Sequence, residues 1–68
     1  MPHIFHNCAT SYIKIDGKKI YLDDSYYALK KKIKDGNDDF ITLRKSTITG
    51  SDKITVNRKN ITEYGEVG

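Results

Sequence analysis

Several residue types that often define a protein's class are scarce or missing in this 68-residue chain. It has one cysteine, which excludes an internal disulfide, one proline and no tryptophan. No apolar run approaches the roughly 20 residues that a membrane-spanning helix needs, and no apolar segment follows a basic start as in an export signal. We therefore expect a cytoplasmic protein that spans no membrane.

The composition is that of a folded domain, because hydrophobic residues make up 37% of the chain and charged residues 31%. A chain this short buries only about 60% of the surface that the unfolded chain exposes, which leaves little room for an enclosed active site. We expect no enzymatic activity, no cofactor and no small-molecule substrate. Short chains without disulfides often gain stability from a second subunit, so a homo-oligomer is also expected as an option.

The first clear structural signal is a β-hairpin. Two β-rich runs, residues 12–15 and 18–22, flank Asp16 and Gly17. An Asp-Gly pair suits a type I′ turn, in which both central residues have positive φ. A two-residue loop places Ile13 opposite Ile20 and gathers the apolar side chains on one face of the hairpin.

The apolar spacing then changes from that of a strand to that of a helix. Leu22, Tyr26, Leu29 and Ile33 follow one another at intervals of four, three and four residues, which predicts an amphipathic helix. Asp23, Asp24 or Ser25 is expected to cap its start. Gly36 is expected to end the helix in the left-handed conformation.

Three further strands are expected after the helix, over residues 40–46, 53–57 and 61–64, with a turn region at residues 47–52 and a mobile tail at 65–68. The N-terminal segment, residues 1–10, is also expected to be mobile. The order β-β-α-β-β-β predicts a single small α+β domain, residues 1–68, with a mainly antiparallel sheet and one short helix. A sheet curled into a small barrel, similar in shape to SH3-like or Sm-like domains, is the alternative.

His3, His6 and Cys8 are the residues weighed as metal ligands or as a nucleophile with its base. Zinc prefers four such ligands, and the spacings here fit neither a Cys-x2-Cys knuckle nor a helical His pair. A catalytic cysteine would also need a cleft and an oxyanion site. We predict no metal centre and no catalytic residue.

The outer face of the expected hairpin is the first candidate binding surface. There Tyr12 lies opposite Tyr21, beside Lys14 opposite Lys19. Rings that stack on bases and cations that hold phosphates are the components of a groove for single-stranded nucleic acid. Cross-strand tyrosine pairs also stabilise sheets without any ligand, so both interpretations stay open.

The second candidate is a set of basic residues in a chain whose net charge is +3. If they converge, they would attract phosphates, an acidic protein or an anionic membrane; otherwise they are a solvated surface. Its members are Lys30, Lys31, Lys34, Arg44, Lys45, Arg58 and Lys59.

These observations favour a small non-enzymatic binding or regulatory module that acts through a protein interface with another protein or with itself. The five tyrosines exceed what a small core needs, and aromatic residues are enriched at interfaces. The high lysine, isoleucine, asparagine and tyrosine content is typical of an AT-rich coding sequence, such as that of a low-GC bacterium or of its phage or prophage. The alternative function is single-stranded nucleic-acid binding through the tyrosine and lysine face.

Overall fold

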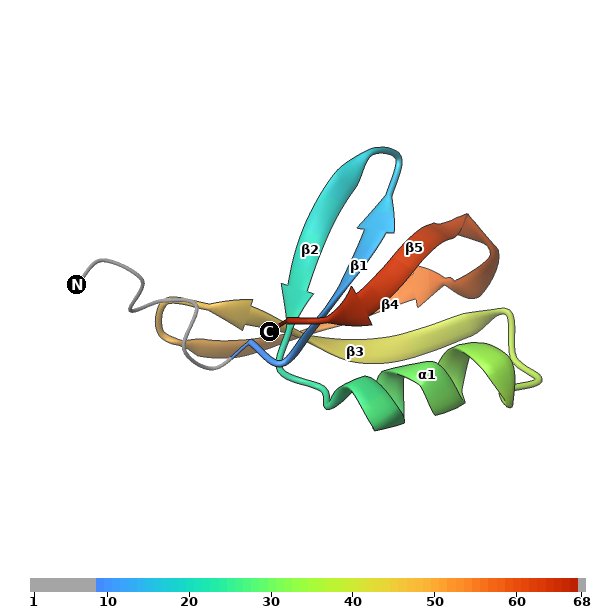
Figure 1. Cartoon of the computed structure of the whole chain (residues 1–68), viewed down its shortest axis with the longest axis horizontal. Helices are drawn as coiled ribbons and strands as arrows, with labels where there is room; N and C mark the ends of the chain where they lie inside the picture. The colour runs from blue at the N-terminus through green and yellow to red at the C-terminus, as the bar shows by residue number, and fades with distance from the viewer. Residues whose placement is uncertain (1–8, 68) are drawn as a thin grey trace.

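The computed structural model describes residues 9–67 and confirms the expected α+β fold (Figure 1). The strands form one antiparallel sheet in the order β4-β3-β2-β1-β5. The elements are β1 (Ser11–Ile15), β2 (Lys18–Leu22), α1 (Tyr26–Lys34), β3 (Phe40–Thr47), β4 (Gly50–Asn57), a 3-10 turn η2 (Arg58–Asn60) and β5 (Ile61–Glu66).

The β1–β2 hairpin has the turn and register that the sequence predicts. Asp16 and Gly17 have φ values of 54° and 79°, as a type I′ turn requires. The register pairs Ile13 with Ile20, Tyr12 with Tyr21 and Lys14 with Lys19. The alternation therefore turns Ile13 into the core and the tyrosines to the other face.

Helix α1 begins as expected but ends differently. The Ser25 side chain accepts a hydrogen bond from the Ala28 backbone N–H at 3.1 Å, so Ser25 is the N-cap. The prediction of a left-handed Gly36 is wrong, because the C-cap is Asp35 in the right-handed region and Gly36 does not have a positive φ. Glycine is needed at position 36 for space, since a Cβ there would lie 2.6 Å from the Lys32 carbonyl oxygen.

The later strands are longer than the sequence pattern indicates. Strands β3 and β4 pair without interruption from Phe40–Asn57 to Thr47–Gly50, so only residues 48 and 49 separate them. The expected turn region thus belongs mostly to the two strands. Strand β5 also continues two residues further than expected, because it pairs with β1 up to Glu66.

The sheet is strongly bent, and it does not close into the barrel that was the alternative. Strands β2 and β3 share a single register pair, Leu22 with Lys45, beyond which they separate. The β1–β2 hairpin with β5 therefore stands across the β3–β4 hairpin, and α1 runs beside β3 (Figure 1). The core lies between these parts and contains the buried side chains of Ile13, Leu22, Leu29, Ile41 and Leu43.

Candidate binding surfaces

The hairpin face predicted from the sequence is present as a cluster. Lys19 Nζ lies 4.7 Å from the ring centroid of Tyr12 and 5.8 Å from that of Tyr21. A cation over an aromatic face is attracted by the negative potential of the ring. The structure thus brings Tyr12, Lys14, Lys19 and Tyr21 together on one side of β1 and β2.

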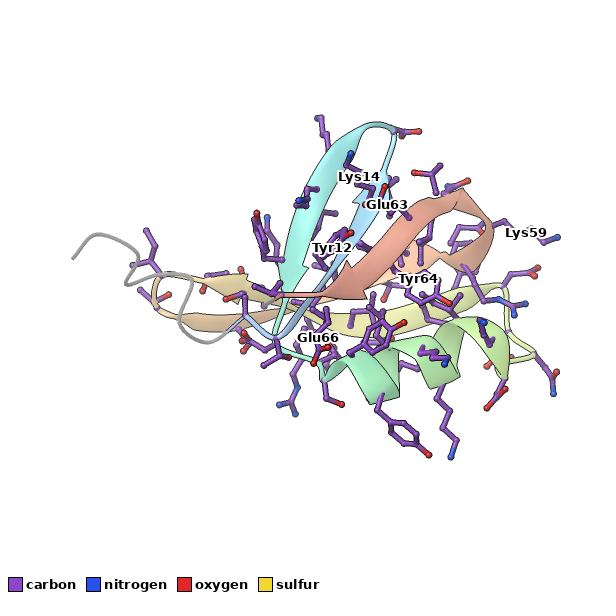
Figure 2. The ribbon with its side chains drawn as sticks, viewed as in Figure 1. Tyr12, Lys14, Lys59, Glu63, Tyr64 and Glu66 are labelled. Carbon is purple, nitrogen blue, oxygen red and sulfur yellow. The ribbon has the colours of Figure 1, made fainter. Side chains whose placement is uncertain are left out.

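An acidic residue from β5 joins this face. The Tyr12 hydroxyl donates a 2.6 Å hydrogen bond to Glu63 Oε2, and Figure 2 shows these two residues close to Lys14. The bond lowers the pKa of Glu63, with Lys14 as a second cause, and it raises the pKa of Tyr12. The carboxylate reduces the attraction of this part of the face for phosphates.

The ring of Tyr12 also covers the backbone of β5. Tyr12 is paired with Gly65 in the register, and a Cβ at Gly65 would lie 2.8 Å from Tyr12 Cε1. The absence of a side chain at Gly65 therefore provides the space that the ring occupies. Sequence reasoning missed Glu63 and Gly65 because no local pattern indicates that β5 lies beside β1.

The basic residues named in the sequence are divided among different parts of the fold. Lys30, Lys31 and Lys34 line one hollow of about 150 Å³ on α1, together with Tyr27 and Asp35. Arg44 lies on β3 opposite Lys53 of β4, a cation that the sequence analysis did not include. Lys45 lines a separate hollow beside β2, and Lys59 is exposed on η2 at the far end of the molecule (Figure 2).

Arg58 is hydrogen-bonded within the fold and is not a solvated surface cation. Its Nη1 donates hydrogen bonds to the backbone carbonyls of Ile33 at 3.2 Å and Gly36 at 2.7 Å. These carbonyls lie at the C-terminal end of α1, where positive charge is favourable. Arg58 therefore fastens the end of α1 to η2.

Exposed aromatic side chains mark a surface that the sequence analysis did not single out. Tyr27 on α1 is 72% exposed and Phe40 at the start of β3 is 61% exposed. Two adjoining hollows of about 440 and 320 Å³ connect them, and both hollows are lined by Lys32 and Gly36. We call this surface the α1–β3 groove; its lining residues are Tyr27, Ala28, Lys31, Lys32, Asp35, Gly36, Asp38, Phe40, Ile41 and Thr42.

The floor of the α1–β3 groove is held by a lysine with two partners. Lys32 Nζ donates to the backbone carbonyl of Thr42 at 2.8 Å and lies 3.4 Å from Asp24 Oδ2. The other oxygen of Asp24 accepts from the Arg44 backbone N–H at 2.7 Å. These bonds join α1 to β3 and fix the spacing between the two walls of the groove.

The sequence periodicity around Tyr27 and Phe40 could have indicated this groove. Tyr27 lies next to Tyr26 and outside the apolar stripe of α1, so a helix that buries Leu29 turns Tyr27 outward. Phe40 alternates with the buried Ile41 in the same way on β3.

The weak metal candidates His3, His6 and Cys8 lie outside the described residues. Within residues 9–67, no group of three or more His, Cys, Asp or Glu side chains is placed to hold a metal ion. The same part of the chain has no helix long and apolar enough to cross a membrane.

Comparisons with family models, with curated proteins and with solved structures gave no match to this chain.

Proposed function

We propose that this chain is a small, cytoplasmic, non-enzymatic binding module whose α1–β3 groove receives an acidic segment of another protein. The observation that carries the proposal is the exposure of Tyr27 and Phe40 at the two ends of one shallow, open groove. Aromatic residues are enriched in interface cores, and exposed apolar surface with a polar rim is typical of protein interaction sites.

The charges around the groove favour an acidic partner over a second copy of the chain. Lys30, Lys31 and Lys34 surround Tyr27, whereas Lys32 is neutralised by its ion pair with Asp24. A symmetric dimer through α1 would place these lysines against their own copies, and such like-charge contacts oppose association. A segment with an apolar side chain for the groove avoids this repulsion when its Asp or Glu residues lie on the side of Lys30, Lys31 and Lys34, away from Asp38. Asp35, which lines the same hollow as these lysines, offsets one of their three charges.

Lys31 supports this proposal from the groove wall. Its Nζ lies 5.8 Å from the Tyr27 ring centroid, so the ring and the cation form one contact surface. A partner carboxylate that reaches Lys31 would bring a neighbouring apolar side chain onto the ring. Apolar and charged contacts would then form together in one small area.

Selection of peptides from a random display library tests this function with a defined probe. We expect the full chain to enrich peptides that combine an aromatic or aliphatic residue with Asp or Glu. A Tyr27→Ser, Phe40→Ser double variant that remains folded should lose at least about tenfold in affinity for these peptides, since truncated interface anchors commonly cost that much.

The matched control is Ile48→Ser, which removes an equally conspicuous apolar side chain, 83% exposed, from the turn between β3 and β4. It should leave peptide affinity unchanged. Equal losses in the control and in the double variant, or selected peptides without acidic residues, would contradict the proposal. Light scattering that shows a dimer lost in the double variant would instead assign the groove to self-association.

A further inference from the structure

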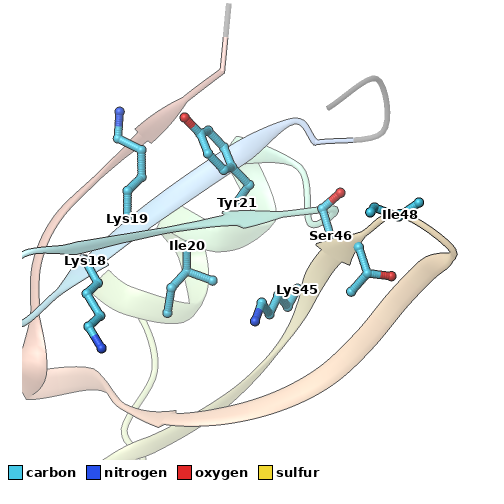
Figure 3. Close-up of a pocket in the computed structure, with 8 residues that line it drawn as sticks. Lys18, Lys19, Ile20, Tyr21, Lys45, Ser46 and Ile48 are labelled. Atoms are coloured by element: carbon cyan, nitrogen blue, oxygen red, sulfur yellow. The ribbon is translucent and has the colours of Figure 1, made fainter. Parts of the chain in front are cut away.

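Another hollow, which shares no lining residue with the α1–β3 groove, lies where β2 separates from β3. It has a volume of about 420 Å³ and is lined by side chains from β2 and from the end of the β3–β4 hairpin (Figure 3). We call it the β2 crevice; its lining residues are Lys18, Lys19, Ile20, Tyr21, Lys45, Ser46, Thr47 and Ile48.

The separation of the strands makes this crevice. After the single pair of Leu22 with Lys45, β3 continues with β4 while β2 rises toward its own turn. Figure 3 shows Lys18, Ile20 and Lys45 on one side of β2 and Lys19 and Tyr21 on the other. The crevice therefore has cations on both sides of one strand.

The charged side chains that line the crevice are all lysines, one of which, Lys19, also helps to lower the pKa of Glu63 on β5. Three of its eight lining residues are lysines and none is acidic. Asp52 lies opposite Lys45 in the β3–β4 register but does not line the crevice. Lys14, opposite Lys19, extends the row of cations from β2 onto β1.

One of the hydroxyls that line this crevice is buried. Ser46 Oγ is buried and makes no hydrogen bond within the described residues. An unsatisfied buried hydroxyl costs stability, because no hydrogen bond among residues 9–67 offsets the loss of its hydration. Because this oxygen is buried in the crevice wall, a phosphate oxygen can accept its hydrogen bond only when the neighbouring side chains shift.

The crevice also offers surfaces for a flat apolar group. The ring of Tyr21 and the side chains of Ile20 and Ile48 line it, and Ile48 is 83% exposed. A row of phosphates with flat rings between them is the chemistry of a nucleic-acid strand. A duplex would keep its bases stacked inside, where these side chains cannot reach them.

We propose that the β2 crevice binds single-stranded nucleic acid, with Lys18, Lys19 and Lys45 on the phosphates, Ser46 donating to a phosphate oxygen, and Tyr21 and Ile48 against a base. This site shares Lys19 and Tyr21 with the hairpin face expected from the sequence, but it extends toward β3 instead of β5. On the hairpin face Tyr12 is engaged by Glu63 and covers Gly65, whereas the crevice lies on the other edge of β2. The inference does not depend on peptide binding by the α1–β3 groove.

Fluorescence anisotropy with a labelled oligothymidylate tests the site in the full chain. Three phosphate contacts predict a slope of about −2 in a plot of log K against log salt, because each contact on a single strand contributes about −0.7. A Lys18→Gln, Lys45→Gln double variant should reduce the slope to about −0.7 and lower the affinity at least about tenfold at low salt. A Lys53→Gln, Lys59→Gln double variant, which has the same net charge as the Lys18→Gln, Lys45→Gln variant, should bind like the wild type.

Ser46→Ala separates a binding role from a structural one. Removing a buried, unpaired hydroxyl should leave thermal stability unchanged or higher, while the oligonucleotide affinity falls. A loss of stability in this variant would show that the hydroxyl has a partner within the fold, and the assignment of Ser46 would be overturned.

Tyr21→Leu and Ile48→Ser test the contact with a base. Each should weaken oligothymidylate binding at least about fivefold and leave the binding of inorganic polyphosphate unchanged, since stacking is lost and phosphate contacts remain. The inference would be overturned if these variants lost as much affinity for polyphosphate as for oligothymidylate, or if a duplex bound more tightly than the single strand. It would also be overturned if the two lysine double variants lost equal affinity, or if the chain bound no oligothymidylate at low salt.

Discussion

Arg58 connects the C-terminal end of α1 to η2, and its replacement should destabilise the whole domain. Its guanidinium donates to the Ile33 carbonyl in the last turn of α1 and to the Gly36 carbonyl just after the helix, while its buried Nε has no hydrogen-bond partner among residues 9–67. Hydrogen bonds to a charged group contribute about 1.5–3 kcal/mol each. Two bonds at the lower limit give about 3 kcal/mol, and removing the unsatisfied Nε returns about 1 kcal/mol. Arg58→Met should therefore cost about 2 kcal/mol.

A loss of this size is large for so short a chain. Stabilities of about 0.05–0.15 kcal/mol per residue are typical of native proteins, and 1 kcal/mol shifts the Tm of a small domain by about 4–8 °C. Thermal unfolding followed by circular dichroism should thus show a Tm lower by about 8–16 °C in Arg58→Met. Arg58→Lys keeps the charge but not the fork of donors, so its Tm should fall between those of Arg58→Met and the wild type.

The matched control for Arg58 is Lys59→Met, which removes a neighbouring cation of η2 whose side chain is exposed. Exposed surface changes of this kind usually stay within about 0.5 kcal/mol of the wild type. Equal Tm values for Arg58→Met and Lys59→Met would refute the connection between Arg58 and α1. Equal values for Arg58→Lys and the wild type would show that charge alone, and not the two-carbonyl geometry, stabilises the helix end.

Two further predictions concern Tyr12. Gly65→Ala should lower the Tm by about 5 °C because its Cβ would meet the Tyr12 ring. The loss should disappear in a Tyr12→Ala background, since alanine is favoured over glycine in a strand when no ring is in the way. Additive effects of the two substitutions would refute the contact. The hydrogen bond between Tyr12 and Glu63 should also give a pH-dependent stability. The pKa of Glu63 is lowered, so this group adds stability above its ordinary pKa of 4.5, and that stability is lost as the pH falls through the folded-state pKa. The pKa of Tyr12 is raised, so this group adds stability below its ordinary pKa of 10.0, and that stability is lost as the pH rises through the folded-state pKa. The difference in urea midpoint between the wild type and Tyr12→Phe should therefore be largest at about pH 6–9 and shrink toward pH 3, whereas a constant difference would contradict the role of the bond.

The sequence predicted those parts of the fold that depend on local signals. The Asp16-Gly17 turn sets the register of the β1–β2 hairpin, and the spacing of Tyr26, Leu29 and Ile33 predicts α1. Both signals act within a few residues, so one sequence is enough to recognise them. The pairing of β5 with β1 joins residues about 50 positions apart, such as Tyr12 and Gly65, and no period in the sequence encodes it.

The candidate sites also divide into those that local sequence signals place and those that depend on long-range contacts. The cluster of Tyr12, Lys14, Lys19 and Tyr21 was predictable because one hairpin register places all four. Arg58 was grouped with the surface cations because a sequence shows a charge but not the carbonyls that the charge will meet. The β2 crevice was missed for a related reason, since it exists only because β2 and β3 separate after one register pair.

The residues most conspicuous in the sequence are therefore not the best probes of function. Tyr12 and Arg58 take part in packing and hydrogen bonding within the fold, so their variants change stability and binding together. Tyr27, Phe40 and Ile48 are 72%, 61% and 83% exposed, and none belongs to the core cluster. Each of these three side chains lines a hollow that is also lined by lysines. Because their removal should leave the fold intact, a loss of binding in their variants can be assigned to the surface itself, and the groove and the crevice can be tested independently of each other.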